Sequence, residues 1–157
     1  MIQPIPDGYQ SLTPMFVFRD ARRAIDFYKR AFGAEERLVM PGPDGKGVMH
    51  AEIRIGSSIV MMGEECPEYP CKSAETLGGS PISFYVYVED VDLAFETAVA
   101  AGASVTMPVA EMFWGDRMGT VQDPFGYSWS IASHTRDLTQ QEIEEGAKAA
   151  MAGTAGT

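Results

Sequence analysis

Two stretches of the sequence resemble each other: MFVFRDARRAIDFYKRAFGA (residues 15–34) and FYVYVEDVDLAFETAVAAGA (residues 84–103). Each begins with a β-rich run and continues with apolar residues at the spacing of one helix face. In each, an aspartate that can cap a helix precedes the helical part, and a glycine suited to a helix C-terminus follows it. We therefore predict a strand and then a helix in both places, with the helices at residues 21–32 and 91–101.

The segments after each predicted helix extend this repeat. Three further β-rich segments follow each helix, and turns rich in Asp, Pro and Gly separate the paired strands, as hairpins require. These segments are residues 35–40, 48–55 and 58–62 in the first half and residues 104–109, 115–122 and 127–132 in the second. The sequence thus predicts two βαβββ modules, an α+β fold in which the two sheets curve together into one cupped sheet.

The repeat divides the chain into a first module (residues 1–62), a linker (63–81), a second module (82–134) and a C-terminal part (135–157). The linker has no clear periodicity, so we expect it to cross the surface as a loop. In the last part, Thr139 and Glu142 match a capping box, which predicts a C-terminal helix. Residues 151–157 contain mainly Ala, Gly and Thr, and we expect them to fray.

The composition argues against several classes of protein. The 157-residue chain has 22 acidic and 12 basic residues, a formal net charge of −10, which argues against nucleic acid or an anionic membrane as the main partner. No apolar run approaches the roughly 20 residues that cross a bilayer, and the start of the chain does not look like a signal peptide. We therefore expect a cytoplasmic protein in which Cys66 and Cys71 are ordinary loop thiols.

Strand alternation predicts which side chains the sheets leave open. In the first strand of the second module, Ser83, Tyr85 and Tyr87 share one face, and the apolar residues between them suit packing under the helix. In the last strand, Trp129 takes the helix side and Ser130 faces away. Two such sheets would enclose a cleft lined by Tyr, Ser, Met and Thr, which is the usual form of a small-molecule pocket.

Three segments of the chain resemble the signatures of a known superfamily. They are DARRAIDFYKRAFGAE (residues 20–35), VMHAEI (48–53) and DPFGYSWSI (123–131). Together with the paired modules, they are similar to the PhnB-like branch of the vicinal oxygen chelate superfamily, which contains glyoxalase I, extradiol dioxygenases, fosfomycin-resistance enzymes and bleomycin-resistance proteins. The likeness covers roughly residues 12–137. It implies the glyoxalase/bleomycin-resistance fold and a homodimer with its cleft at or near the subunit interface.

The resemblance also implies where a metal would bind. Enzymes of this superfamily hold one divalent metal in the cleft, with ligands from the first and last strand of each module. Residue by residue, these positions correspond to Thr13, to Val60 or Met61, to Ser83 and to Ser130. None of these side chains is a good ligand for a divalent transition metal. We therefore expect no metal at the usual positions, and no cofactor.

A displaced metal site is the alternative, because a divalent metal is still possible elsewhere in the cleft. His50 and Glu52 lie two residues apart on a predicted strand, so they share a face and could reach one ion. A catalytic zinc site usually has three protein ligands. His134 follows the last predicted strand and could contribute only if the chain turned back. Without a metal, His50 could order the hairpin, line the cleft or act as a general base.

Residues near the entry to a strand of the second module are candidates for ligand binding. The resemblance puts Trp114 and Arg117 close to the cleft mouth. Arg117 could hold a carboxylate or phosphate by a bidentate contact. Alternatively, it could form a surface ion pair with Asp116 or Asp123.

Three functional hypotheses follow. The first is a metal-free protein that binds a small apolar or aromatic molecule, neutral or cationic, between Tyr85, Tyr87, Trp114 and methionines such as Met15 and Met61. The same methionines would equally suit a core. The second hypothesis is a lyase, isomerase or dioxygenase with a relocated metal. The third is a non-catalytic dimerisation module whose tail engages another protein.

Overall fold

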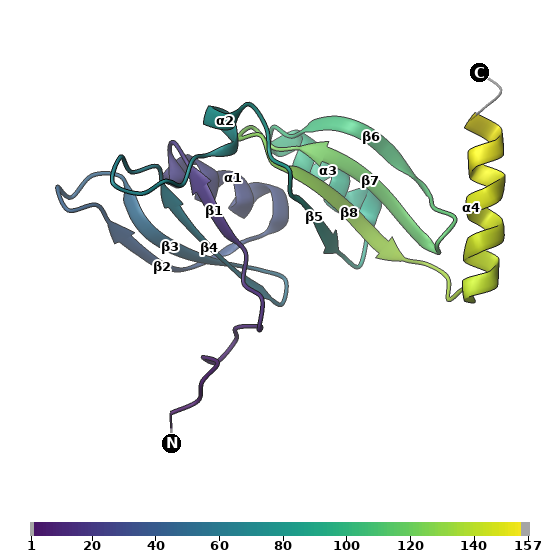
Figure 1. Ribbon diagram of the computed structural model, residues 1–157, viewed down its shortest axis with the longest axis horizontal. Helices are drawn as coiled ribbons and strands as arrows, with labels where there is room; N and C mark the ends of the chain where they lie inside the picture. The colour runs from purple at the N-terminus through teal and green to yellow at the C-terminus, as the bar shows by residue number, and fades with distance from the viewer. Residues whose placement is uncertain (1, 155–157) are drawn as a thin grey trace.

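The computed structural model describes residues 2–154, and it consists of two βαβββ modules followed by a helix (Figure 1). The first module contains β1 (Met15–Phe18), α1 (Ala21–Phe32), β2 (Glu35–Pro41), β3 (Val48–Ile55) and β4 (Ser58–Glu64). The second contains β5 (Ser83–Tyr87), α3 (Val91–Ala101), β6 (Ser104–Glu111), β7 (Asp116–Gln122) and β8 (Ser128–His134). The linker contains α2 (Ala74–Leu77), and α4 (Gln140–Thr154) follows the second module. The predicted fold class and repeat are confirmed.

The linker differs from the prediction in two details. β4 continues to Glu64, inside the predicted linker, because its parallel pairing with β1 extends to that residue. The linker also forms the short helix α2, since the Ser73 hydroxyl accepts a hydrogen bond from the Thr76 backbone N–H at 3.2 Å. α4 continues through Thr154, and the expected fraying of residues 151–157 stays a prediction. Residues 155–157 lie outside the described part of the chain.

Both modules use the same strand order. It is β1-β4-β3-β2 in the first sheet and β5-β8-β7-β6 in the second. The first strand of each module pairs in parallel with the last, and the other pairs are antiparallel. Met15 pairs with Met61 in the first sheet, and Tyr85 pairs with Ser130 in the second. Corresponding residues of the sequence repeat therefore occupy corresponding places in the two sheets.

The two long helices of the modules begin and end where the sequence predicts. The side chains of Asp20 and Asp90 each accept a 3.0 Å hydrogen bond from a backbone N–H in the first turn. Gly33 follows α1 in the left-handed conformation, with φ 61°. Gly102 follows α3 with φ 120°, a different conformation that also favours glycine. The caps thus confirm the helix boundaries that were read from the repeat.

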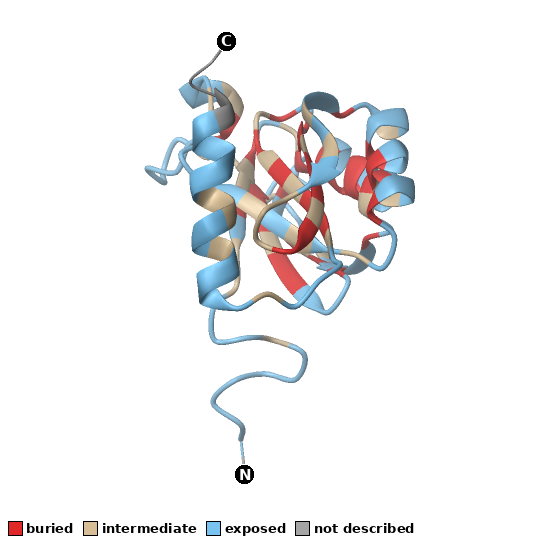
Figure 2. Cartoon of the chain, turned by 90° about the vertical axis from the view of Figure 1, so that its right-hand side faces the viewer, coloured by how far each residue is buried: buried red, intermediate tan, exposed pale blue. Residues whose placement is uncertain are grey.

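One core spans both modules. α1 and α3 pack against each other, and buried residues gather between these helices and the sheets (Figures 1 and 2). Phe16 of β1 stacks on Tyr127 and packs edge-on against Phe84, with ring centroids 4.9 and 4.4 Å apart. The Tyr28 hydroxyl on α1 donates to the Asp123 carboxylate in the second module at 2.6 Å. These contacts hold the two open sheet faces at a defined position relative to each other.

The C-terminal helix α4 stands away from both sheets (Figures 1 and 2). Its predicted capping box is confirmed: the Thr139 backbone N–H donates to the Glu142 carboxylate at 2.8 Å, and the Glu142 N–H donates to the Thr139 hydroxyl at 3.3 Å. The helix approaches the β6–β7 turn where Gly146 lies against Phe113. Among residues 2–154, no helix is both long and apolar enough to cross a bilayer.

Candidate ligand-binding site

Each sheet carries its helix on one face and leaves most of the other face open. On β5, Phe84 and Val86 are partly buried against the core, whereas Tyr85 and Tyr87 are 45% and 62% exposed. On β8, Trp129 is buried in the core and Ser130 is only partly buried. The predicted alternation of helix-facing and open side chains is therefore confirmed on both strands.

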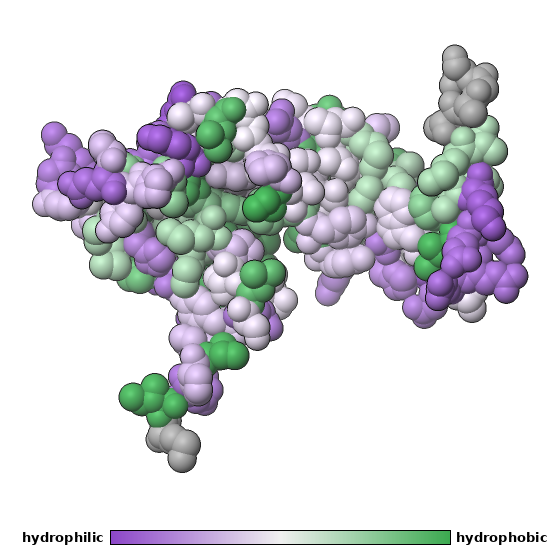
Figure 3. Space-filling view, in the orientation of Figure 1, coloured by the Kyte–Doolittle hydropathy of each residue, from purple (hydrophilic) through white to green (hydrophobic). Residues whose placement is uncertain are grey.

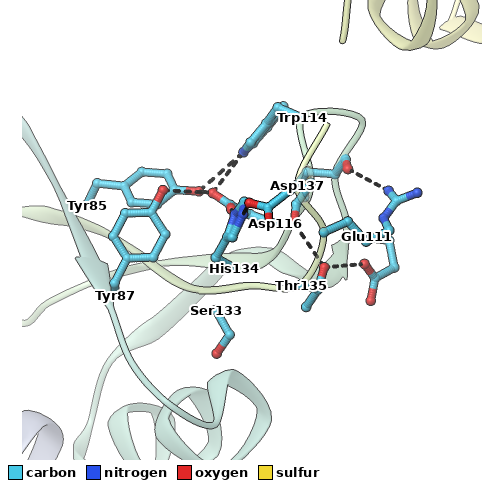
Figure 4. Close-up of polar contacts among 12 residues, drawn as sticks. Tyr85, Tyr87, Glu111, Trp114, Asp116, Ser133, His134, Thr135 and Asp137 are labelled. Atoms are coloured by element: carbon cyan, nitrogen blue, oxygen red, sulfur yellow. Dashed lines mark hydrogen bonds and ion pairs between the residues drawn. The ribbon is translucent and has the colours of Figure 1, made fainter. Parts of the chain in front are cut away.

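Asp116, the first residue of β7, is the centre of a polar cluster on the open face of the second module (Figure 4). The residue is only 2% exposed. Its Oδ2 atom accepts hydrogen bonds from the Tyr85 hydroxyl at 2.7 Å, the Tyr87 hydroxyl at 3.0 Å and the Trp114 Nε1–H at 3.1 Å. We call the surface formed by these three aromatic residues around Asp116, together with the adjoining His134, the aromatic face.

His134 bridges two carboxylates. Its Nδ1 lies 2.8 Å from Oδ1 of Asp116, and its Nε2 lies 3.0 Å from Oδ1 of Asp137. Because a carboxylate only accepts hydrogen bonds, both contacts are hydrogen bonds only when both ring nitrogens carry a proton. These hydrogen bonds, that to Asp116 first, raise the pKa of His134 above its ordinary value. The site therefore favours the imidazolium form.

The same contacts set the charges of the other groups. Burial by itself would raise the pKa of Asp116, but the hydrogen bonds from His134, Tyr85, Tyr87 and Trp114 outweigh it and hold that pKa below its ordinary value. Burial is the largest reason why the pKa of Tyr85 rises to about 12. At neutral pH the cluster therefore contains an ionised Asp116 and neutral phenols.

Strand register and one tight turn bring the cluster together. Asp116 and His134 are direct partners on β7 and β8, and the two tyrosines alternate along β5. Trp114 lies in the turn before β7, next to Gly115, which has φ 100°. A Cβ on Gly115 would collide with the carbonyl oxygen of Arg136, so only glycine fits this turn without a shift.

The central role of Asp116 and His134 was not predicted from the sequence. The sequence pattern suggested Asp116 as an ion-pair partner of Arg117 and placed His134 after the last strand. The structure instead makes His134 the final residue of β8. Counting outward from the turn predicted at residues 123–126 pairs position 116 with position 133, one residue short of its true partner His134, because Tyr127 also belongs to the turn. Such counting needs the hairpin register, which the strand pattern alone leaves open.

The structure does not bring Arg117 to the aromatic face. Next to Asp116 on β7, it points to the opposite side of the sheet. Its Nε and Nη2 atoms lie 2.9 and 2.7 Å from the two carboxylate oxygens of Asp92 on α3, and its Nη1 lies 3.6 Å from Glu111. The ion-pair alternative is therefore realised, but with different partners from the expected Asp116 and Asp123.

The open face of the first module has a different cluster. His50 and Glu52 point the same way from β3, with Nε2 and Oε1 3.3 Å apart. Tyr9 of the N-terminal segment hydrogen-bonds to Glu52, and this bond is the main cause of a lowered pKa at that carboxyl. The Arg37 guanidinium lies 5.8 Å from the centre of the Tyr9 ring. Within residues 2–154, no group of three or more His, Cys, Asp or Glu side chains is arranged to hold a metal.

The residues at the superfamily's metal positions are poor metal ligands. Thr13 and Met61 line a hollow of about 440 Å³ beside the N-terminal segment, and Met15 pairs with Met61. In the second sheet, Ser83 and Ser130 lie on β5 and β8. A thioether and neutral hydroxyl groups do not fit a divalent transition metal, which favours imidazole, thiolate or carboxylate ligands. We therefore assign no chemical step to a metal at these positions.

A larger hollow of about 780 Å³ adjoins the aromatic face. It runs between the end of α1, the β3–β4 turn, the end of β5 and the start of α3. Tyr87 and His134 belong both to its lining and to the Asp116 cluster. We call this hollow of about 780 Å³ the seam groove. In Figure 3 the surface narrows between the two modules.

Known proteins share this architecture. A family model described as the Glyoxalase/Bleomycin resistance protein/Dioxygenase superfamily matches residues 13–131. An uncharacterized protein of Mycobacterium bovis, Mb0911c, is 41% identical over 137 residues, which cover 85% of this chain and 90% of that protein.

Solved structures agree with the family match. TioX from Micromonospora sp. ML1 superposes with a TM-score of 0.63 at 28% identity, covering 83% of this chain and 100% of TioX. The PhnB protein from Bacillus cereus superposes with a TM-score of 0.62 at 21% identity, covering 79% and 99% of the two chains. The second likeness concerns the fold alone.

Proposed function

Because the chain belongs to the glyoxalase/bleomycin resistance protein/dioxygenase superfamily, we propose that it binds a small apolar or aromatic molecule in the manner of a metal-free binding protein. One observation carries the proposal. Tyr85, Tyr87 and Trp114 anchor their polar atoms on Asp116, while the two tyrosine residues stay about half exposed to solvent. The aromatic face is thus an apolar surface whose side chains are already held in place.

A fixed aromatic surface favours binding for two reasons. The rings of Tyr85 and Tyr87 lie 5.1 Å apart, and hydrogen bonds to one buried carboxylate restrict both of them. A ligand that packs on them therefore orders few side chains on binding, which lowers the entropy lost. Each aromatic contact would contribute about 0.5–1.5 kcal/mol beyond the burial of apolar area.

A fluorescent neutral probe, N-phenyl-1-naphthylamine, tests this function. We expect saturable binding to the wild-type chain. Tyr85→Ala should weaken binding about tenfold, because it removes a ring contact and loosens its neighbour. Tyr85→Phe keeps the ring but loses its hydrogen bond to Asp116, so it should weaken binding less than Tyr85→Ala does. Tyr69→Ala, at a 67% exposed tyrosine of the linker, is the matched control and should have no effect. Absence of saturable binding, or equal binding by all four proteins, would refute the proposal.

A homodimer is a second part of the proposal. The open faces expose apolar side chains such as Met15 and Tyr87, which a second copy could cover at the rim of the cleft. Light scattering at micromolar concentration should give twice the chain mass. A mass near 17.1 kDa would contradict it.

A metal-dependent lyase, isomerase or dioxygenase is the alternative. The observation that favours it is the placement of His50 beside Glu52 on the open face of the first module. Elemental analysis of the purified protein decides between the two functions. If the wild type held one tightly bound divalent metal per chain and His50→Ala did not, the enzyme would be the better supported function.

A further inference from the structure

The hydrogen-bond donors of the aromatic face are directed at carboxylates of the protein. The Tyr85 and Tyr87 hydroxyls and the Trp114 indole N–H donate to Asp116. A phenol has one proton and an indole has one N–H, so none of these groups has another to offer. The two N–H groups of the His134 imidazolium are likewise directed at carboxylates.

The face therefore presents acceptors and ring faces to a ligand. The phenol oxygens of Tyr85 and Tyr87 keep lone pairs after donating their protons to Asp116. Asp137 adds an exposed carboxylate at the edge of the face. The faces of aromatic rings carry partial negative charge, which attracts cations. All of these groups favour a ligand that donates hydrogen bonds and carries positive charge.

The ionised groups around the aromatic face also favour a cationic ligand. The carboxylates of Asp116 and Asp137 flank the single imidazolium of His134, which leaves one net negative charge. The neighbouring arginines are turned elsewhere: Arg136 donates to a main-chain carbonyl at 3.4 Å, and Arg117 is paired on the helix side. An anionic ligand would meet the like charge of these carboxylates.

The seam groove offers space for the rest of such a ligand. Its larger apolar lining residues are Phe32, Ile55, Val86, Val88 and Leu93. Beyond Tyr87 and His134, the ionisable groups in its lining are Glu89 and Asp90, and no lysine or arginine of the described chain is among them. The groove's volume of about 780 Å³ falls in the range of small-molecule sites.

We propose that the ligand is an organic cation, a protonated amine on an apolar or aromatic body, whose ammonium lies on the aromatic face beside Tyr87 and whose body extends into the seam groove. This inference rests on the proposed function and names the ligand class that the same face selects. It narrows the range of apolar and aromatic molecules to those that carry a donating positive charge.

Three naphthalene probes of nearly equal size test the selection. They are 1-naphthylmethylammonium, 1-naphthalenemethanol and 1-naphthoate, each titrated calorimetrically into the full-length chain at pH 7. We expect the ammonium to bind about tenfold more tightly than the alcohol, because its hydrogen bonds are charge-assisted, and the carboxylate to bind most weakly. Added salt should reduce the difference between ammonium and alcohol.

Two matched pairs of variants locate the bound probe. Glu89→Gln should weaken the ammonium about two- to fivefold and leave the alcohol unchanged, whereas Glu96→Gln, on α3 outside the groove, should change neither. Leu93→Ala should weaken both probes, whereas Leu77→Ala, at a similarly exposed leucine of α2, should weaken neither.

The outcomes separate this inference from the proposed function. Equal binding of all three probes, or tighter binding of the carboxylate, would overturn the selection while leaving an aromatic-binding protein. If neither Glu89→Gln nor Leu93→Ala changed the affinity for the ammonium probe, the placement in the seam groove would be wrong. Failure of every probe, including N-phenyl-1-naphthylamine, would remove the proposed function itself.

Discussion

Replacing Asp116 with asparagine tests the hydrogen-bonded cluster most directly. Asparagine has nearly the same shape, but it has one acceptor oxygen and one NH₂ group. If the amide oxygen keeps the hydrogen bonds from the two tyrosines and Trp114, the NH₂ group faces Nδ1 of His134 at the place where Oδ1 accepts at 2.8 Å. Two donors cannot share that contact, so His134 must lose its Nδ1 proton. The substitution therefore converts an imidazolium into a neutral imidazole.

The expected loss of stability follows from the three hydrogen bonds that Asp116 accepts from Tyr85, Tyr87 and Trp114. Each changes from a charged acceptor to a neutral one, and such a change lowers the stabilisation from about 1.5–3 to about 0.5–1.5 kcal/mol. The tyrosines are about half exposed, so water compensates for part of this difference. We expect Asp116→Asn to lower the free energy of unfolding by about 1–3 kcal/mol, and the pKa of His134 to fall from its raised value.

Urea unfolding at pH 6 and an NMR titration of the His134 ring measure the two effects. Asp92→Asn is the matched control, because Asp92 holds Arg117 in an exposed ion pair, and such pairs contribute little to stability. That control should leave the His134 titration unchanged. If Asp116→Asn left the His134 pKa in place and cost less than about 0.5 kcal/mol, the hydrogen-bond assignment of the cluster would be wrong.

Three further substitutions probe the fold and the site. Tyr28→Phe removes the 2.6 Å hydrogen bond to the buried Asp123 between the modules and should lower the urea-unfolding free energy by about 1–3 kcal/mol; unchanged stability would contradict this coupling. Folding raises the pKa of His134, so the protonated ring stabilises the folded protein fully below about pH 6.5. This stabilisation is lost as the pH rises through the folded-state pKa. The difference in Tm between the wild type and His134→Gln should therefore shrink between pH 6 and pH 9. A constant difference would argue against an imidazolium. Gly115→Ala should lower stability by more than about 1 kcal/mol in thermal unfolding, since φ is positive and its Cβ meets the Arg136 carbonyl; a neutral result would show that the turn adapts.

Several features of the site could be predicted from the sequence. Tyr85 and Tyr87 alternate with core residues, so their shared open face follows from the pleat of one strand. The resemblance placed Trp114 near the cleft mouth, but it did not specify the hydrogen bond from Trp114 to Asp116. For Arg117 the sequence left a binding role, which came from the resemblance, beside a surface ion pair. The structure shows an ion pair with Asp92 on α3, a partner that only the packing of the helix on the sheet reveals.

The sequence by itself determined the two modules, their helices and the two faces of each strand. Periodicity, aspartate caps and turn residues act over a few neighbouring positions, so they can be read without the fold. Only the tertiary structure decided that Asp116 would collect hydrogen bonds from Tyr85, 31 residues away, and from His134 on the adjacent strand. Those contacts depend on the register between strands and on a turn that admits only glycine. They also gave the face its chemistry, since the carboxylates of Asp116 and Asp137 take its donors and leave acceptors and rings for the ligand.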